Sequence, residues 1–78
     1  MDKFKIGQAV YDESYGQGIV IYRSVYYEAP YPIIVAYHIK EYDKFITKLY
    51  THDGRYKRED CIVLLTMEEY NELKDKEM

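Results

Sequence analysis

Few side chains in this sequence are of the types that bind metal ions or act as nucleophiles. The chain contains two histidines, His38 and His52, and one cysteine, Cys61. A zinc site in a protein needs a cluster of nitrogen and sulfur ligands at short spacing, and three scattered residues do not supply one. We therefore expect no metal site and no cofactor.

Other catalytic arrangements are also missing from the pattern. Cys61 precedes an apolar run, so we expect it to be a small buried residue; a nucleophile would need a base and an oxyanion site. Gly16 and Gly18 lack the third glycine and the following helix of a dinucleotide-binding motif. The adjacent acids at 12–13 and 59–60 would point apart in a strand, so we interpret them as ordinary loop acids. We do not expect an enzyme.

Tyrosine is the unusual residue type, with 11 in a chain of 78. A small domain has little interior, so several of these rings must lie at the surface. Rigid phenols at strand ends lose little entropy on binding and are common in protein interfaces. We predict a protein-binding site made of Tyr15, Tyr26, Tyr27 and Tyr31. The alternative is that these rings cap the ends of the core.

A second candidate site is basic. Arg55, Lys57 and Arg58 surround Tyr56, a pattern that can hold single-stranded nucleic acid by phosphate contact and base stacking. Acidic residues follow at 59–60 and weaken the positive field, so a solvated loop is the alternative interpretation. We keep nucleic-acid binding through Arg55, Tyr56, Lys57 and Arg58 as the second hypothesis.

The charge balance and the composition limit the functional classes to which this chain can belong. Residues 1–66 hold nine basic and nine acidic side chains, and the whole net charge of −3 comes from residues 67–78. With this balance the chain as a whole lacks the excess of positive charge that is typical of nucleic-acid-binding proteins. The single cysteine excludes an internal disulfide and suits a reducing compartment. The start of the chain is charged and no apolar run is long enough to cross a membrane, so we expect a soluble protein without membrane contact.

The elements that position these residues are mostly strands. Gly16 and Gly18 form a turn that permits positive φ and close backbone approach. Pro30 and Pro32 interrupt strand pairing, and Gly54 follows Asp53 in a strong turn dipeptide. Runs rich in Ile, Val and Tyr predict five strands, at residues 4–12, 19–27, 33–39, 45–51 and 61–65.

The strands differ in how clearly they show their buried face. In the segment 33–39, alternation places Ile33, Val35, Tyr37 and Ile39 in the core. In the segment 45–51, two registers fit: either Phe45 and Leu49 or Ile46 and Tyr50 face inward.

The C-terminal segment predicts a short helix. Thr66 and the glutamate at 69 form a capping box, and Met67, Tyr70 and Leu73 then share one face. We therefore divide the chain into a β unit at 1–66 and a short acidic helix at 67–78. Five short strands with tight glycine turns favour a small barrel, because closure removes exposed sheet edges.

Two parts of the sequence resemble known families. The first part resembles the opening of SH3-like and Tudor-like bacterial domains, at positions Phe4, Gly7, Val10, Asp12, Gly16, Gly18 and Val20. Examples are the C-terminal Tudor-like domain of superfamily 1 repair helicases and the RNA-polymerase-interacting domain of CarD-type regulators. The segments 31–37 and 50–56 resemble uncharacterised small phage and prophage proteins. The resemblance implies a five-stranded SH3-like or Tudor-like barrel in the cytoplasm of a bacterial or phage-infected host cell, but fold analogy does not transfer function.

These observations lead to three hypotheses about function. The first is a non-catalytic module that binds another protein, in a phage-encoded protein directed at host nucleic-acid machinery. The second is the nucleic-acid-binding barrel. The third is a homo-oligomeric structural or assembly component.

Overall fold

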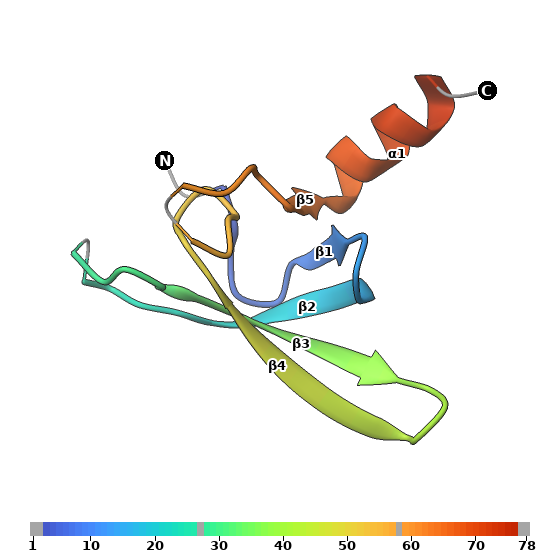
Figure 1. The fold of residues 1–78 in the computed structure, drawn as a ribbon, viewed down its shortest axis with the longest axis horizontal. Coiled ribbons are helices and arrows are strands. Elements are labelled where there is room, and N and C mark those ends of the chain that lie inside the picture. The colour runs from blue at the N-terminus through green and yellow to red at the C-terminus, as the bar shows by residue number, and fades with distance from the viewer. Residues whose placement is uncertain (1–2, 27, 58, 77–78) are drawn as a thin grey trace.

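The computed structural model describes residues 3–26, 28–57 and 59–76, which form one antiparallel sheet and one helix (Figure 1). The elements are β1 (Ala9–Asp12), β2 (Gly16–Arg23), β3 (Ile33–Ile39), β4 (Lys44–Tyr50), β5 (Leu64–Thr66) and α1 (Met67–Lys76). The strand order in the sheet is β4-β3-β2-β1-β5. Strands β1 to β4 therefore form a meander, and β5 returns to pair with β1. The expected mainly β fold with a short C-terminal helix is confirmed.

The sheet is open, whereas a closed barrel was expected. Among the described residues, β4 and β5 are the two edge strands and do not pair with each other. The segment between them gives the reason. The Gly54 carbonyl accepts hydrogen bonds from the backbone N–H groups of both Val63 and Leu64, each at 2.9 Å. This turn therefore occupies the backbone position at the start of β5 that pairing with β4 would need.

The core lies on one face of the curled sheet. Alternate residues of the central strands point into it, as the period of a β-strand requires. Ile33, Val35 and Tyr37 of β3 are fully buried, as predicted, and Ile39 at the strand end is half-buried. The complete buried hydrophobic set is Phe4, Val10, Val20, Ile33, Val35, Tyr37, Tyr50 and Leu64.

The structure settles the register of β4. Tyr50 is fully buried and Ile46 packs against the core, whereas Phe45 and Leu49 are exposed. Pairing of Ile33 with Tyr50 and of Tyr37 with Ile46 fixes this choice. Of the two registers that fit the sequence, the one with Ile46 and Tyr50 inward is correct.

The two glycines after β1 have different roles: the predicted positive φ is found at Gly16, whereas Gly18 lies inside β2 and not in the predicted turn. Gly16 has φ +85°, a conformation that L side chains rarely adopt. Gly18 lies beneath the ring of Tyr37: a Cβ atom there would be 2.6 Å from ring carbon Cδ1. Gly16 therefore allows the turn into β2, and Gly18 leaves room for a buried phenol on the neighbouring strand.

The first and last strands in the chain, β1 and β5, are shorter than predicted. β1 begins at Ala9 because a turn precedes it, in which Gln8 N–H donates to the Lys5 carbonyl and Gly7 has φ +89°. Because no strand forms at 61–63, Cys61 is exposed, and its predicted burial is wrong.

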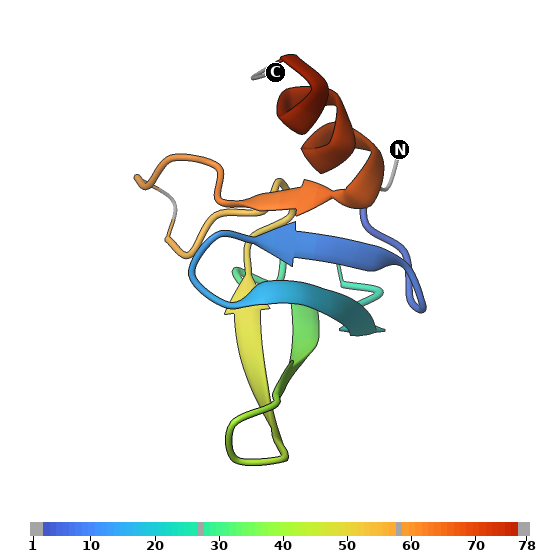
Figure 2. The same cartoon turned by 90° about the vertical axis from the view of Figure 1, so that its right-hand side faces the viewer.

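Helix α1 packs against the β1–β5 end of the sheet (Figure 2). The predicted capping box is confirmed: Glu69 N–H donates to Thr66 Oγ1 at 3.2 Å, and Thr66 N–H donates to Glu69 Oε1 at 3.0 Å. The ring of Tyr70 stacks on Tyr11 with centroids 3.9 Å apart, and Lys3 Nζ lies 3.0 Å from Glu69 Oε2. The helix is thus held to the sheet, although it contains no fully buried residue. Residues 77–78 of the predicted helical segment lie outside the described residues.

No helix in the described part of the chain is long and apolar enough to span a bilayer.

Candidate functional site

A buried polar cluster surrounds Asp12 at the end of β1. Asp12 is 1% exposed, and its carboxylate accepts three hydrogen bonds. Ser14 N–H donates to Oδ1 at 2.8 Å, and the hydroxyls of Tyr50 and Tyr56 donate to Oδ2 at 2.7 and 2.6 Å. The hydroxyl of Tyr37 lies 2.6 Å from that of Tyr50 and extends the chain into the core. We call these groups the Asp12 network.

The phenols of the Asp12 network are held in their neutral, hydrogen-bonding form. Burial raises the pKa values of Tyr37 and Tyr50 well above the usual range, and the hydrogen bonds with Tyr37 and Asp12 raise that of Tyr50 further. Burial and the hydrogen bond to Asp12 raise the pKa of Tyr56 to about 12. At neutral pH these groups donate hydrogen bonds and are not bases or nucleophiles. We therefore interpret the network as structural, and Asp12 is not the ordinary loop acid that its sequence context indicated.

The four tyrosines of the predicted protein-binding site are not gathered on one surface. Tyr15 precedes β2, whereas Tyr26 and Tyr31 lie in the β2–β3 connection, so the length of β2, roughly 25 Å, separates them. Tyr15 is half-buried against Tyr37, with ring centroids 5.2 Å apart, and Lys48 Nζ lies 5.0 Å above its ring.

The other members of that predicted set have more open positions. Tyr26 is exposed, and Tyr31 lines a shallow hollow of about 450 Å³ with Pro30, His52 and Asp53 among its other walls. Tyr27 lies outside the described residues. Only Tyr26 and Tyr31 of the described members therefore share one connection with accessible rings.

The predicted basic site is largely occupied by internal contacts. Arg55 Nε donates to Asp53 Oδ2 at 2.9 Å, and Arg55 Nη1 donates to the Asp60 carbonyl at 2.9 Å. Hydrogen bonds from Thr51 and Arg55 lower the pKa of Asp53. The Tyr56 hydroxyl is committed to Asp12, as described above. Lys57 is exposed, and Arg58 lies outside the described residues.

A surface that sequence reasoning missed covers the side of β2, β3 and β4 opposite the core. We call it the outer face. Its five most exposed apolar side chains are between 48% and 73% accessible: Ile19, Ile21, Tyr22, Phe45 and Leu49. The half-buried Ile34 and Ala36 lie between them, since Ile34 pairs with both Tyr22 and Leu49.

The outer face carries no Asp, Glu, Lys or Arg side chain among the described residues of β2–β4. Its polar members are Gln17, His38 and Thr47. His38 Nε2 lies 3.0 Å from Asp43 Oδ1 in the turn beyond β3, and the His38 ring tilts against Phe45. An antiparallel sheet with one face in water normally alternates apolar and polar residues. The continuous apolar runs at 19–22 and 33–37 are instead typical of strands covered on both faces, and they are the signal that could have revealed this surface.

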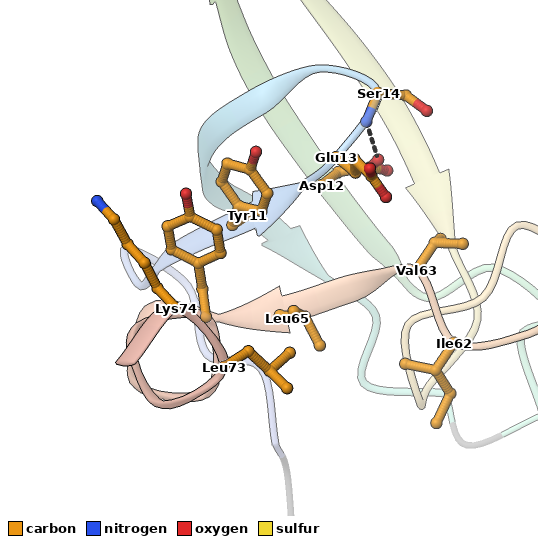
Figure 3. A pocket seen from close by; sticks show the side chains of 10 residues that line it. Tyr11, Asp12, Glu13, Ser14, Ile62, Val63, Leu65, Leu73 and Lys74 are labelled. Carbon is orange, nitrogen blue, oxygen red and sulfur yellow. Dashed lines mark hydrogen bonds between the residues drawn. The ribbon is translucent and has the colours of Figure 1, made fainter. Parts of the chain in front are cut away.

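A groove of about 540 Å³ lies between α1 and the β1–β5 pair (Figure 3). Ile62, Leu65 and Leu73 give it an apolar side, and Glu13 and Lys74 carry opposite charges at its rim. The rings of Tyr11 and Tyr70, which stack on each other, also line it. The groove is mixed in character, and it is the place where the helix meets the sheet.

Among the described residues, no group of three or more His, Cys, Asp or Glu side chains is arranged to hold a metal ion. Comparisons of this chain with protein-family models, with curated proteins and with solved structures found no match.

Proposed function

We propose that this chain is a non-catalytic module that binds a protein, and that the outer face of β2–β4 is its contact surface. The observation that carries the proposal is a sheet face without charged side chains, on which Phe45 and Leu49 are more than half exposed. Charged residues make up 32% of the chain, so their absence from this face of three neighbouring strands is notable, since Arg23, Lys44 and Lys48 of the same strands stand on the core side. Contiguous exposed apolar surface on a small protein is typical of interaction sites.

The free energy gained by covering the apolar side chains of the outer face favours binding of a partner. Apolar surface contributes about 25 cal/mol for each Å² removed from water. Rings such as Phe45 and Tyr22 each bring roughly 150–250 Å² to an interface when fully covered. The side chains stand on paired strands, so little backbone order has to be created on binding.

Two residues of the predicted aromatic site, Tyr26 and Tyr31, lie in the connection beyond one end of the outer face. Tyr22 pairs with Ile34 near the end of β2, and the β2–β3 connection with Tyr26 and Tyr31 follows. We propose that Tyr26 and Tyr31 extend the contact surface beyond the sheet. Tyr15, which packs on Tyr37, is not needed for this proposal.

The fold proposal is that the sheet is an opened relative of SH3-like and Tudor-like domains. It is supported by the resemblance of the opening segment, by the glycine pair at the β1–β2 turn, and by the return of β5 to β1. The resemblance to phage and prophage proteins adds the proposal that the bound protein belongs to the host's nucleic-acid machinery. Neither proposal is needed for the outer face to act as a contact surface.

A capture experiment with matched variants tests the function. The chain is immobilised and exposed to bacterial lysate, and retained proteins are identified by mass spectrometry. Phe45→Glu places a charge on the outer face, whereas Tyr42→Glu changes an equally exposed ring in the β3–β4 turn: the two rings are 73% and 70% accessible. We expect Phe45→Glu to lose proteins that the wild type and Tyr42→Glu retain. Identical retained sets for all three chains, together with no self-association through Phe45, would contradict the proposal.

A further inference from the structure

We infer that the outer face binds a second copy of this chain, with the two outer faces packed against each other across a two-fold axis that runs along β3. This inference rests on the proposed function, because it names the partner of the same surface. Three observations lead to it: the uncharged character of the face, the position of the acidic helix, and the protection of the β4 edge.

The outer face is complementary to itself. A two-fold interface brings the same patch of both subunits together, so like charges on the patch would meet. No Asp, Glu, Lys or Arg among the described residues of β2–β4 stands on this face, and the Asp43 carboxylate that contacts His38 lies in the turn at its end. With the axis along β3, Ile34 and Ala36 lie at the centre of the interface. Phe45 and Leu49 of each copy then cover Ile19 and Tyr22 of the other, in an aligned packing about 10 Å thick.

The charge distribution of the chain favours this arrangement. Residues 1–66 are formally neutral, and the net charge of −3 belongs entirely to residues 67–78. Helix α1 carries most of these acids and contacts β1 and β5, at the end of the strand order away from β4. A two-fold axis along β3 puts the two helices at opposite ends of the pair, four to six strand spacings or roughly 19–29 Å apart. This is more than two Debye lengths at physiological salt, since one is roughly 8 Å.

The edge of the sheet is less suited to a second copy than its face. β4 is an edge strand and bears Lys44 and Lys48 on its core side. Lysine on an edge strand is a common protection against edge-to-edge pairing. We therefore assign the contact to the face and not to the β4 edge.

The size of the face predicts a weak dimer. Three strands of about seven residues cover roughly 14 by 24 Å of sheet. This footprint is well below the roughly 800 Å² of accessible surface that each partner buries in an interface of standard size. The core of each copy is complete without the other, so we expect folded monomers and dimers in rapid exchange at micromolar concentration.

Sedimentation-velocity ultracentrifugation tests the inference with the full chain from about 10 μM to about 500 μM, a range that brackets a micromolar dissociation constant. We expect the weight-average sedimentation coefficient of the wild type and of Tyr42→Glu to rise with concentration toward that of a dimer. We expect Phe45→Glu to remain monomeric, with its dissociation constant raised at least tenfold. Thermal unfolding of each variant shows that it is folded, and Leu49→Glu provides a second substitution on the outer face.

Two results would overturn the inference. One is a wild-type chain that stays monomeric over the whole range; the other is self-association that Phe45→Glu and Leu49→Glu leave unchanged. The capture experiment separates this failure from failure of the proposed function. A monomeric chain that retains a different protein through Phe45 would refute the second copy and leave the protein-binding proposal standing. A monomeric chain that retains nothing through Phe45 would refute both.

Discussion

Replacing Tyr50 by phenylalanine tests the Asp12 network most directly. The substitution keeps the buried ring and removes one hydroxyl that takes part in two hydrogen bonds, to Asp12 Oδ2 at 2.7 Å and with the Tyr37 hydroxyl at 2.6 Å. Asp12 keeps its bonds from Ser14 and Tyr56. The Tyr37 hydroxyl loses the partner that the structure gives it.

The size of the effect follows from these two bonds. A hydrogen bond to a charged group contributes about 1.5–3 kcal/mol and a neutral one about 0.5–1.5 kcal/mol. Tyr50→Phe should therefore lower the free energy of unfolding by about 2–4 kcal/mol. A chain of 78 residues is stable by about 4–12 kcal/mol at 0.05–0.15 kcal/mol per residue. The substitution thus removes a large share of the total stability.

Two further variants show how the loss of stability depends on which hydrogen bonds are removed. Tyr37→Phe removes only the neutral bond to Tyr50 and should cost about 0.5–1.5 kcal/mol. Tyr42→Phe changes an exposed ring and should stay within about 0.5 kcal/mol of the wild type. Urea unfolding followed by circular dichroism measures all three. On heating, 1 kcal/mol corresponds to about 4–8 °C for a domain of this size, so Tyr50→Phe should melt at least roughly 8 °C lower.

The order of the three variants decides the outcome. The interpretation requires the loss to be largest for Tyr50→Phe, intermediate for Tyr37→Phe and negligible for Tyr42→Phe. If Tyr50→Phe were no more destabilising than Tyr37→Phe, the Asp12 carboxylate would not be the centre of a stabilising network.

Four further predictions follow from particular contacts. Gly18→Ala should destabilise the fold by about 1–3 kcal/mol, because the new Cβ would lie 2.6 Å from the Tyr37 ring; unchanged urea midpoints would contradict this. Thr66→Ala removes the N-cap of α1 and should cost about 1 kcal/mol, with reduced helical circular dichroism. Since the pKa of Tyr56 is about 12 when folded and near 10 when unfolded, its contribution to stability is complete below pH 10 and is lost as the pH rises through 12. Alkaline unfolding followed by phenolate absorbance checks this, and unfolding complete below pH 10 would refute it. In gel shifts at low salt we expect no complex with single-stranded oligonucleotides, and a complex abolished by Lys57→Ala would instead support the basic-loop hypothesis.

Local sequence rules were sufficient where neighbouring residues decide the structure. The capping box at Thr66 involves groups three residues apart, and the glycine turn before β2 depends on the φ preference of Gly16 itself. The strand Ile33–Ile39 was predicted with its bounds and its buried face, because its alternation and its flanking prolines are both local. The C-terminal helix began where the capping pattern placed it.

Position in three dimensions decided the rest. Asp12 looks like any loop acid, and it becomes the centre of a buried network only because Tyr50 and Tyr56, 38 and 44 residues later, come to its side. The register of β4 fitted two patterns, and pairing with β3 chose between them. The tyrosines could be counted but not assigned, since a phenol has the same propensities in a core, a network or an exposed loop.

Sequence alone therefore determined that the chain forms short antiparallel strands, glycine turns and a capped helix, because those features depend on residues close together in the chain. Only the tertiary structure decided that β4 and β5 are the two edges of the described sheet and do not pair with each other, that Cys61 is exposed, and that one side of β2–β4 is an apolar surface. Each of these depends on which distant segments meet. A single strand shows that it has two apolar faces, but it does not show which of them its own chain will cover.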